Sequence, residues 1–155
     1  MKRQARARHK VDITDEYERL AFDRERVVAA ARRVLERARV TTAAISVAVV
    51  DNATIHALNV EFLQHDFPTD VITFPLEQSD ERLEGELVVS GEYAETMAAE
   101  FGWSAADELL LYVVHGALHL VGYDDLDETS LTTMRQQEDE VLSHFGLRVP
   151  RVSRR

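Results

Sequence analysis

The sequence of 155 residues contains no cysteine, no long apolar run and almost no basic residues in its middle. Without cysteine, disulfide bonds and closed thiolate zinc sites are excluded. The longest strongly apolar run, about 13 residues at 109–121, is shorter than the roughly 20 residues that a membrane-spanning helix needs. The basic start is not followed by the apolar segment of a signal peptide. We therefore expect a cytoplasmic protein without a membrane partner.

The positive charge that is present is concentrated at the two ends of the chain. Residues 1–10 carry five basic residues and residues 148–155 carry four, with no acidic residue in either segment. Removing these nine charges from the net charge of −10 leaves −19 on residues 11–147. Basic tails bind phosphate backbones, although short charged termini are also commonly solvated ends without a partner. We expect two basic tails, 1–10 and 148–155, around one folded domain at 11–147.

Apolar periodicity and capping residues predict an α/β (α+β) fold, in which a small mixed sheet is packed with about five helices. The predicted order is strand, helix, strand, helix, strand, strand, then three helices. We expect strands at 10–14, 45–50, 71–74 and 85–90, and helices that begin at Asp23, Asp51 or Asn52, Ser90, Ser104 and about Asp127.

Two of these strands carry a more specific expectation. The strand at 45–50 is apolar on both faces, which is typical of a central strand covered on two sides. Pro68 and Pro75 bracket the strand at 71–74, because proline cannot donate to a ladder and is favoured at strand ends. The polar stretch 77–82 then predicts a hairpin with a loose loop.

A histidine pair lies in the central segment 109–125, which reads LLLYVVHGALHLVGYDD. In a helix, His115 and His119 lie on the same face, where both imidazoles reach one cation. Gly122 suits the left-handed position just past a helix end, so a carboxylate on the returning chain could supply a third ligand. Three protein ligands leave a fourth position for a catalytic water. The alternative is two hydrogen-bonded core histidines, because the spacing fits both.

The stretch His-Gly-Ala-Leu-His-Leu-Val-Gly-Tyr-Asp at 115–124 follows Pro-Thr-Asp-Val at 68–71 and Gly-Glu-Leu-Val-Val-Ser at 85–90. Together these motifs resemble the YbeY family of ribosomal-RNA maturation endoribonucleases, over about residues 10–147. The resemblance implies one zinc ion held by three side chains on a central helix and the turn after it. It also implies cleavage of single-stranded RNA in ribosomal-RNA maturation and small-subunit assembly, with ribosomal RNA and the small ribosomal subunit as partners and no DNA.

Two positions depart from the family pattern. Asp125 stands where the family has a third histidine, so the implied ligand set is His115, His119 and Asp125. A carboxylate lowers the net charge of the site and makes a bound water less acidic, and it also suits iron or manganese. Leu63 stands where the family has an arginine associated with catalysis. His65, when protonated, is a substitute cation, or else a surface-loop histidine without that role.

Three functions remain as interpretations of the sequence. The first is a metal-dependent endoribonuclease, and the second is a non-catalytic assembly factor whose metal only holds the turn at 122–125. The third, a zinc peptidase, is disfavoured because Gly116 stands where His-Glu-x-x-His enzymes place their general base. Asp124 and Glu86 are candidate bases, but each has a structural alternative, in the turn and at a strand start. The sequence therefore identifies no catalytic residue beyond the metal ligands.

Overall fold

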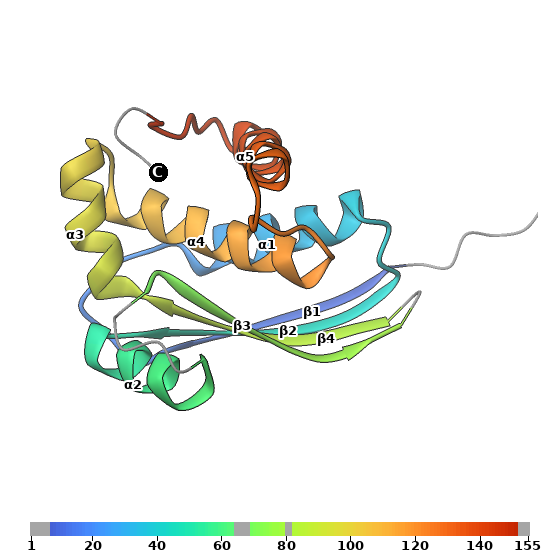
Figure 1. Ribbon diagram of the computed structural model, residues 1–155, viewed down its shortest axis with the longest axis horizontal. Coiled ribbons are helices and arrows are strands. Elements are labelled where there is room, and N and C mark those ends of the chain that lie inside the picture. The colour runs from blue at the N-terminus through green and yellow to red at the C-terminus, as the bar shows by residue number, and fades with distance from the viewer. Residues whose placement is uncertain (1–6, 64–68, 80–81, 152–155) are drawn as a thin grey trace, which may run out of the picture.

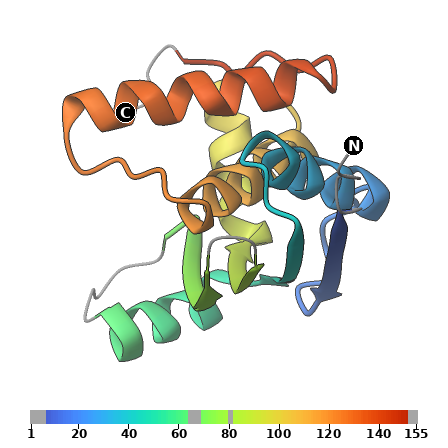
Figure 2. The same ribbon diagram turned by 90° about the vertical axis from the view of Figure 1, so that its right-hand side faces the viewer.

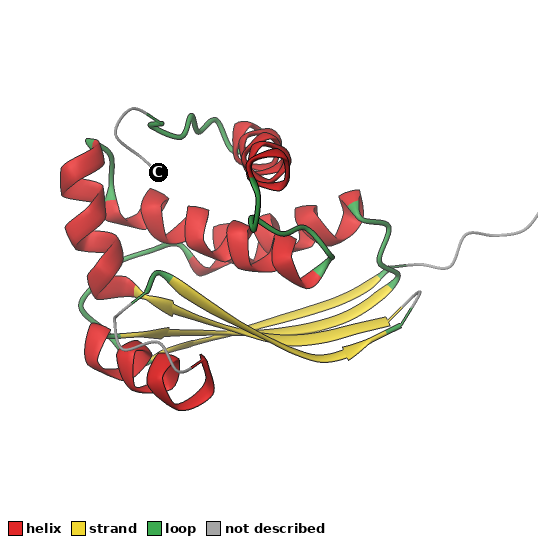
Figure 3. Cartoon of the chain, viewed as in Figure 1, coloured by secondary structure: helices red, strands yellow, loops and turns green. Residues whose placement is uncertain are grey.

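The computed structural model describes residues 7–63, 69–79 and 82–151. Its elements follow one another in the predicted order, and Figure 3 separates the helices from the strands. The elements are β1 (Arg8–Asp15), α1 (Arg24–Arg37), β2 (Thr42–Val50), α2 (Asn52–Leu63), β3 (Val71–Gln78), β4 (Arg82–Ser90), α3 (Gly91–Phe101), α4 (Ala105–Leu120) and α5 (Glu128–Ser143). This arrangement confirms the predicted α+β class. No helix in the described ranges is long and apolar enough to cross a membrane.

The sheet is mixed and has the strand order β1-β2-β4-β3. Strands β1, β2 and β4 are parallel, and β3 runs antiparallel to β4 as the first strand of the predicted hairpin. Helix α1 connects β1 to β2, as a crossover between parallel strands requires. Because β3 and β4 follow one another directly, the hairpin places β3 at one edge of the sheet and β4 inside it.

The helices are distributed unequally over the two faces of the sheet (Figure 1). Helices α1 and α4 cover one face, α3 stands at one end of the sheet against α4, and α5 lies across the outside of α1 and α4 as a further layer (Figure 2). Among the described helices, only α2 lies against the other face. The larger hydrophobic core therefore fills the space between the sheet and α4, whose apolar side chains are almost all buried.

Two sequence expectations about the strands need correction. Strand β2 is central in the sheet, as predicted, but it is covered on both faces only near its end, because Ser46 is exposed on the face opposite the main core. Strand β3 does not end at Pro75 but continues to Gln78 through a register shift between Pro75 and Glu77. Pro75 is tolerated because β3 is an edge strand, where a missing backbone donor leaves no neighbouring strand unpaired. Pro68 lies outside the described residues.

Candidate metal centre

Local capping signals fix where α4 begins and ends. The Ser104 hydroxyl accepts a hydrogen bond from the Asp107 backbone N–H at 3.1 Å, as the capping pattern predicts. At the other end Gly122 adopts the left-handed region with φ of 108°, which confirms the predicted turn. The chain then folds back, so that residues 123–127 return beside the last turn of α4. This return is what brings Asp125 to the histidine pair.

Gly116 allows α4 to approach the sheet closely. A Cβ atom at this position would lie 2.9 Å from Leu87 Cδ2 and 3.0 Å from Val71 Cγ2, both in the main core or packed against it. Contacts this short would force the core to rearrange. A glutamate directly after His115 would therefore point into the packed core, which gives a structural reason why a peptidase motif does not fit here.

His115, His119 and Asp125 converge on one point. Their ligand atoms all lie within 4.8 Å of one another. The two Nε2 atoms are 3.1 Å apart, and the Asp125 oxygens lie 3.4 Å from His115 Nε2 and 3.7 Å from His119 Nε2. The structure thus brings together all three residues that the sequence named as ligands.

The spacing of these donors fits a divalent ion. A zinc ion bound at roughly 2.0–2.2 Å by tetrahedrally arranged donors keeps them about 3.4 Å apart. The three donor separations in the structure, 3.1, 3.4 and 3.7 Å, are within about 0.3 Å of that value. The side chains of His115, His119 and Asp125 are 19%, 27% and 35% exposed, so solvent reaches the group. Two imidazoles and one carboxylate are also a recognised set for catalytic zinc, with a fourth position for water.

Glu138 on α5 orients His115. Its Oε2 lies 2.5 Å from His115 Nδ1, and the Glu138 side chain is only 5% exposed. An ionised carboxylate only accepts, so Nδ1 carries the hydrogen and Nε2 is left for the ion. Arg151 in turn donates to Glu138 Oε1 at 3.1 Å. The buried carboxylate is therefore held from both sides, which fixes the orientation of the imidazole ring.

The electrostatics of the site favour a cation. Burial lowers the pKa of His115, but hydrogen bonds to Asp125 and Glu138 outweigh burial and raise this pKa to about 10. Burial, together with the charge of His115, lowers the pKa of His119. The hydrogen bond from His115 lowers the pKa of Asp125. Two carboxylates thus hold a proton on His115, and a divalent ion bound there would take over the role of that positive charge.

A cavity of about 210 Å³ opens beside the three ligands. His115 and Asp125 form part of its wall, together with Asp70 at the start of β3 and residues of α4, α5 and the C-terminal segment. This volume is below the roughly 300–1,000 Å³ of sites for drug-sized ligands. The cavity therefore suits one group of a larger molecule, with the rest of that molecule outside.

The other residues considered in the sequence lie away from this centre or only support it. Asp124 Oδ1 accepts from the Leu126 backbone N–H at 3.3 Å, which is the structural role expected in the turn. Glu86 lies in the middle of β4, not at its start, and is exposed on the face opposite α4, because its neighbours Gly85 and Leu87 both face that helix. Leu63 is the last residue of α2 and is 46% exposed. His65 lies outside the described residues.

Sequence reasoning missed Glu138 and Arg151. Glu138 lies four residues from both Met134 and Leu142, on the buried face of α5, so an acid inside an apolar stripe was the available signal. Burial of an acid without a partner is costly. An acid at this position therefore predicts a buried cation or histidine as its partner. Arg151 had no comparable signal, because its contact with Glu138 depends on how the chain folds back after α5.

The family model described as endoribonuclease YbeY matches residues 10–146 of this chain. A protein named endoribonuclease YbeY from Rhodopirellula baltica is 45% identical over 130 residues, which cover 77% of this chain and 67% of that protein. A protein of the same name from Bacillus licheniformis is 35% identical over 153 residues, with 88% and 95% of the two chains covered.

A solved structure supports the same relationship at the level of the fold. The solution structure of a protein from Thermotoga maritima superimposes with a TM-score of 0.57 and 29% sequence identity. The match covers 87% of this chain and 91% of the other. The likeness therefore extends over most of the chain and is not limited to one motif. With the match to the family model and the two relatives, this likeness shows that the chain belongs to the YbeY endoribonuclease family.

Proposed function

We propose that this protein is a metal-dependent endoribonuclease that cleaves single-stranded RNA in ribosomal-RNA maturation and small-subunit assembly, in the cytoplasm. The observation that carries the proposal is the convergence of His115, His119 and Asp125, with donor separations of 3.1 to 3.7 Å. Membership of a family whose members are named endoribonucleases supplies the class of substrate.

The proposed metal is one zinc ion held by His115, His119 and Asp125. A bound zinc ion would lower the pKa of a water molecule and polarise a phosphodiester oxygen. The chain itself contributes a fixed set of donors, because Glu138 holds the His115 ring and the turn after Gly122 holds Asp125. The partial exposure of all three ligand side chains leaves room for water and RNA on the solvent side.

The two rival functions receive less support. A metal that only stabilises the turn would be expected in a closed shell of four protein ligands, whereas the described residues place three together, beside an open cavity. A peptidase would need a general base next to His115, where Gly116 packs against the core. Strand β1 begins at Arg8, inside the predicted N-terminal tail, and Arg151 of the C-terminal tail pairs with Glu138 and Asp139. The other basic residues of the tails are proposed to add phosphate contacts, which would make RNA binding sensitive to salt.

The experiment is a paired measurement of metal content and RNA cleavage. Wild-type protein should bind one equivalent of zinc and cleave a single-stranded ribosomal-RNA fragment, and a chelator should abolish cleavage. His119→Ala should lose both properties, while His56→Ala on α2 serves as a histidine control with unchanged metal content. Equal residual cleavage by wild type and His119→Ala would indicate a contaminating nuclease and contradict the proposal.

A further inference from the structure

The cavity beside the metal centre contains two arginines. Arg135 on α5 and Arg151 on the C-terminal segment both form part of its wall, together with the ligands His115 and Asp125. A phosphodiester placed at the three metal ligands would therefore have a guanidinium within the same cavity. Which of the two arginines is available to bind it follows from their contacts.

Arg151 is held by two carboxylates of α5. One of its terminal nitrogens forms ion pairs with Glu138 at 3.1 Å and with Asp139 at 2.9 Å, and it donates to the Arg135 backbone carbonyl at 3.3 Å. Glu138 in turn accepts from His115. The positive charge of Arg151 therefore already neutralises the carboxylate that orients a metal ligand.

Arg135 has no such partner in the part of the chain that the structure describes. Its natural partners on the helix would be Glu138 and Asp139, three and four residues further along on the same face, but both carboxylates are taken by Arg151. Within residues 7–63, 69–79 and 82–151, the Arg135 guanidinium forms no ion pair or hydrogen bond. It is nonetheless half-buried and faces the cavity. Asp70, Asp125 and Glu138 line the same cavity, but none of them pairs directly with Arg135. A half-buried guanidinium that no described carboxylate contacts is available to bind an anion.

We propose that Arg135 binds a non-bridging phosphate oxygen of the RNA strand held at the metal centre. This inference rests on the proposed function, because it takes RNA as the ligand. The planar guanidinium matches the geometry of a phosphate, and partial burial strengthens the ion pair relative to one at the open surface. Arg151 supports this role indirectly, by keeping Glu138 and Asp139 from capturing the Arg135 side chain. Arg135 is thus the substrate-facing cation of the centre.

The test is RNA binding measured without metal, followed by cleavage with zinc. A labelled single-stranded RNA of about twelve nucleotides is titrated with wild type, Arg135→Gln, Arg135→Lys and the control Arg39→Gln, in a chelator and at several salt concentrations. Arg39 is exposed and follows α1, and the Arg39→Gln substitution removes the same charge as Arg135→Gln. Arg135→Gln should bind roughly tenfold more weakly. It should also reduce the salt slope by about 0.7, the contribution of one phosphate contact on a single strand.

The remaining variants and outcomes separate this inference from the proposed function. Arg135→Lys should retain part of the affinity, because a positive charge remains, and Arg39→Gln should match wild type within about twofold. If Arg135→Gln binds RNA as Arg39→Gln does, or if wild type binds no RNA, the inference is overturned. If the binding differences appear but zinc-loaded wild type does not cleave, the inference stands and the proposed nuclease function fails. Thermal unfolding of each variant checks that the fold is retained.

Discussion

Leu87 and Glu86 are neighbours on β4, yet they belong to two different environments. Leu87 is fully buried beneath α4 and lies against Gly116 of that helix. Glu86 is exposed on the opposite face of the sheet. On the covered side the same helix supplies both the core and the two histidines. On the other side α2 contributes a small cluster with Ile55 at its centre. The two histidines therefore lie on the helix that also supplies much of the main core.

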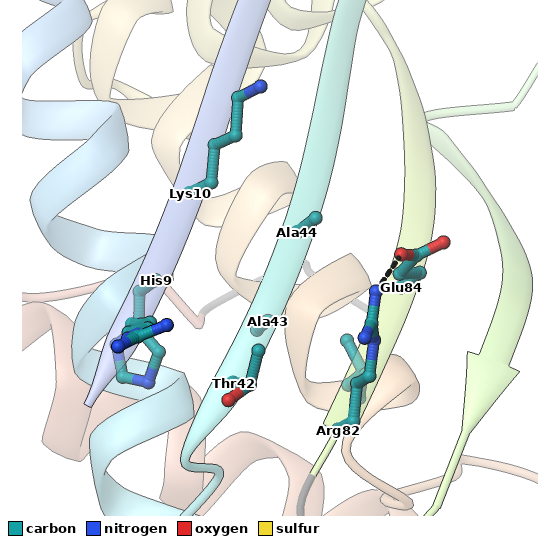
Figure 4. Close-up of a pocket in the computed structure, with 9 residues that line it drawn as sticks. His9, Lys10, Thr42, Ala43, Ala44, Arg82 and Glu84 are labelled. Carbon is teal, nitrogen blue, oxygen red and sulfur yellow. Dashed lines mark hydrogen bonds and ion pairs between the residues drawn. The ribbon is translucent and has the colours of Figure 1, made fainter. Parts of the chain in front are cut away.

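The face of the sheet opposite α4 carries charged side chains where β1, β2 and β4 lie side by side (Figure 4). Lys10, Ala44 and Glu84 lie side by side on β1, β2 and β4, and Arg82 is paired with Glu84 at 3.0 Å. These residues border a shallow cavity of about 350 Å³, which is larger than the one at the metal centre. Two of its basic residues, Lys10 and Arg82, are paired with acids on the same strands, Asp12 and Glu84. Size alone does not identify the functional site.

The largest expected contrast between the two environments is in stability. Leu87→Ala removes a fully buried side chain from the main core and should lower the free energy of unfolding by about 2–5 kcal/mol. The matched change Leu76→Ala, at a side chain that is 61% exposed, should alter it by less than about 0.5 kcal/mol. Urea unfolding of both variants measures the difference. Equal losses would show that the main core is not where the structure places it.

The next contrast concerns metal affinity. Glu138→Gln keeps the shape of the side chain but weakens its hydrogen bond to His115, so zinc affinity should fall roughly 10–100-fold. Glu86→Gln, the same change on the exposed face, should leave affinity unchanged. Competition with a zinc indicator measures both values. An unchanged affinity in Glu138→Gln would mean that this carboxylate does not orient the ligand.

A smaller effect is expected where the two sides of the sheet are joined. The buried Ser90 hydroxyl accepts from the Tyr93 backbone N–H and donates to Asn52 Oδ1 at 2.7 Å, which links the start of α3 to the start of α2. Ser90→Ala should cost about 1–2 kcal/mol of unfolding free energy. Thermal unfolding provides the measurement, with Ser143→Ala near the end of α5 as an exposed serine control. A loss no greater than that of the control would contradict this link.

Local signals in the sequence predicted most of the fold. Ser104 and Gly122 mark the two ends of α4 through capping and a left-handed turn, and both rules act within a few residues. The expectations that failed depend on distant parts of the chain. Pro75 ends a strand only if that strand is internal, and β3 is an edge strand. The exposure of Ser46 depends on how far α2 extends over the sheet.

The sequence likewise predicted the three candidate metal ligands but not the residues around them. His115 and His119 are set by helical spacing, and Asp125 was named through the family resemblance and lies beside them in the structure. Glu138 could have been suspected from its place in the apolar stripe of α5. The proposed role of Arg135 could not, because it depends on the lack of an acidic partner among the described residues. That absence follows from Arg151, which reaches back from 16 residues further along the chain.

The most direct test is X-ray absorption spectroscopy of the zinc-loaded protein. The structure predicts two imidazole nitrogens, one carboxylate oxygen and one solvent oxygen around the ion. Asp125→Ala should replace the carboxylate contribution with solvent and leave both imidazoles in place. A shell completed by a fourth protein ligand, or a spectrum that does not change in Asp125→Ala, would contradict a solvent-accessible centre built from His115, His119 and Asp125.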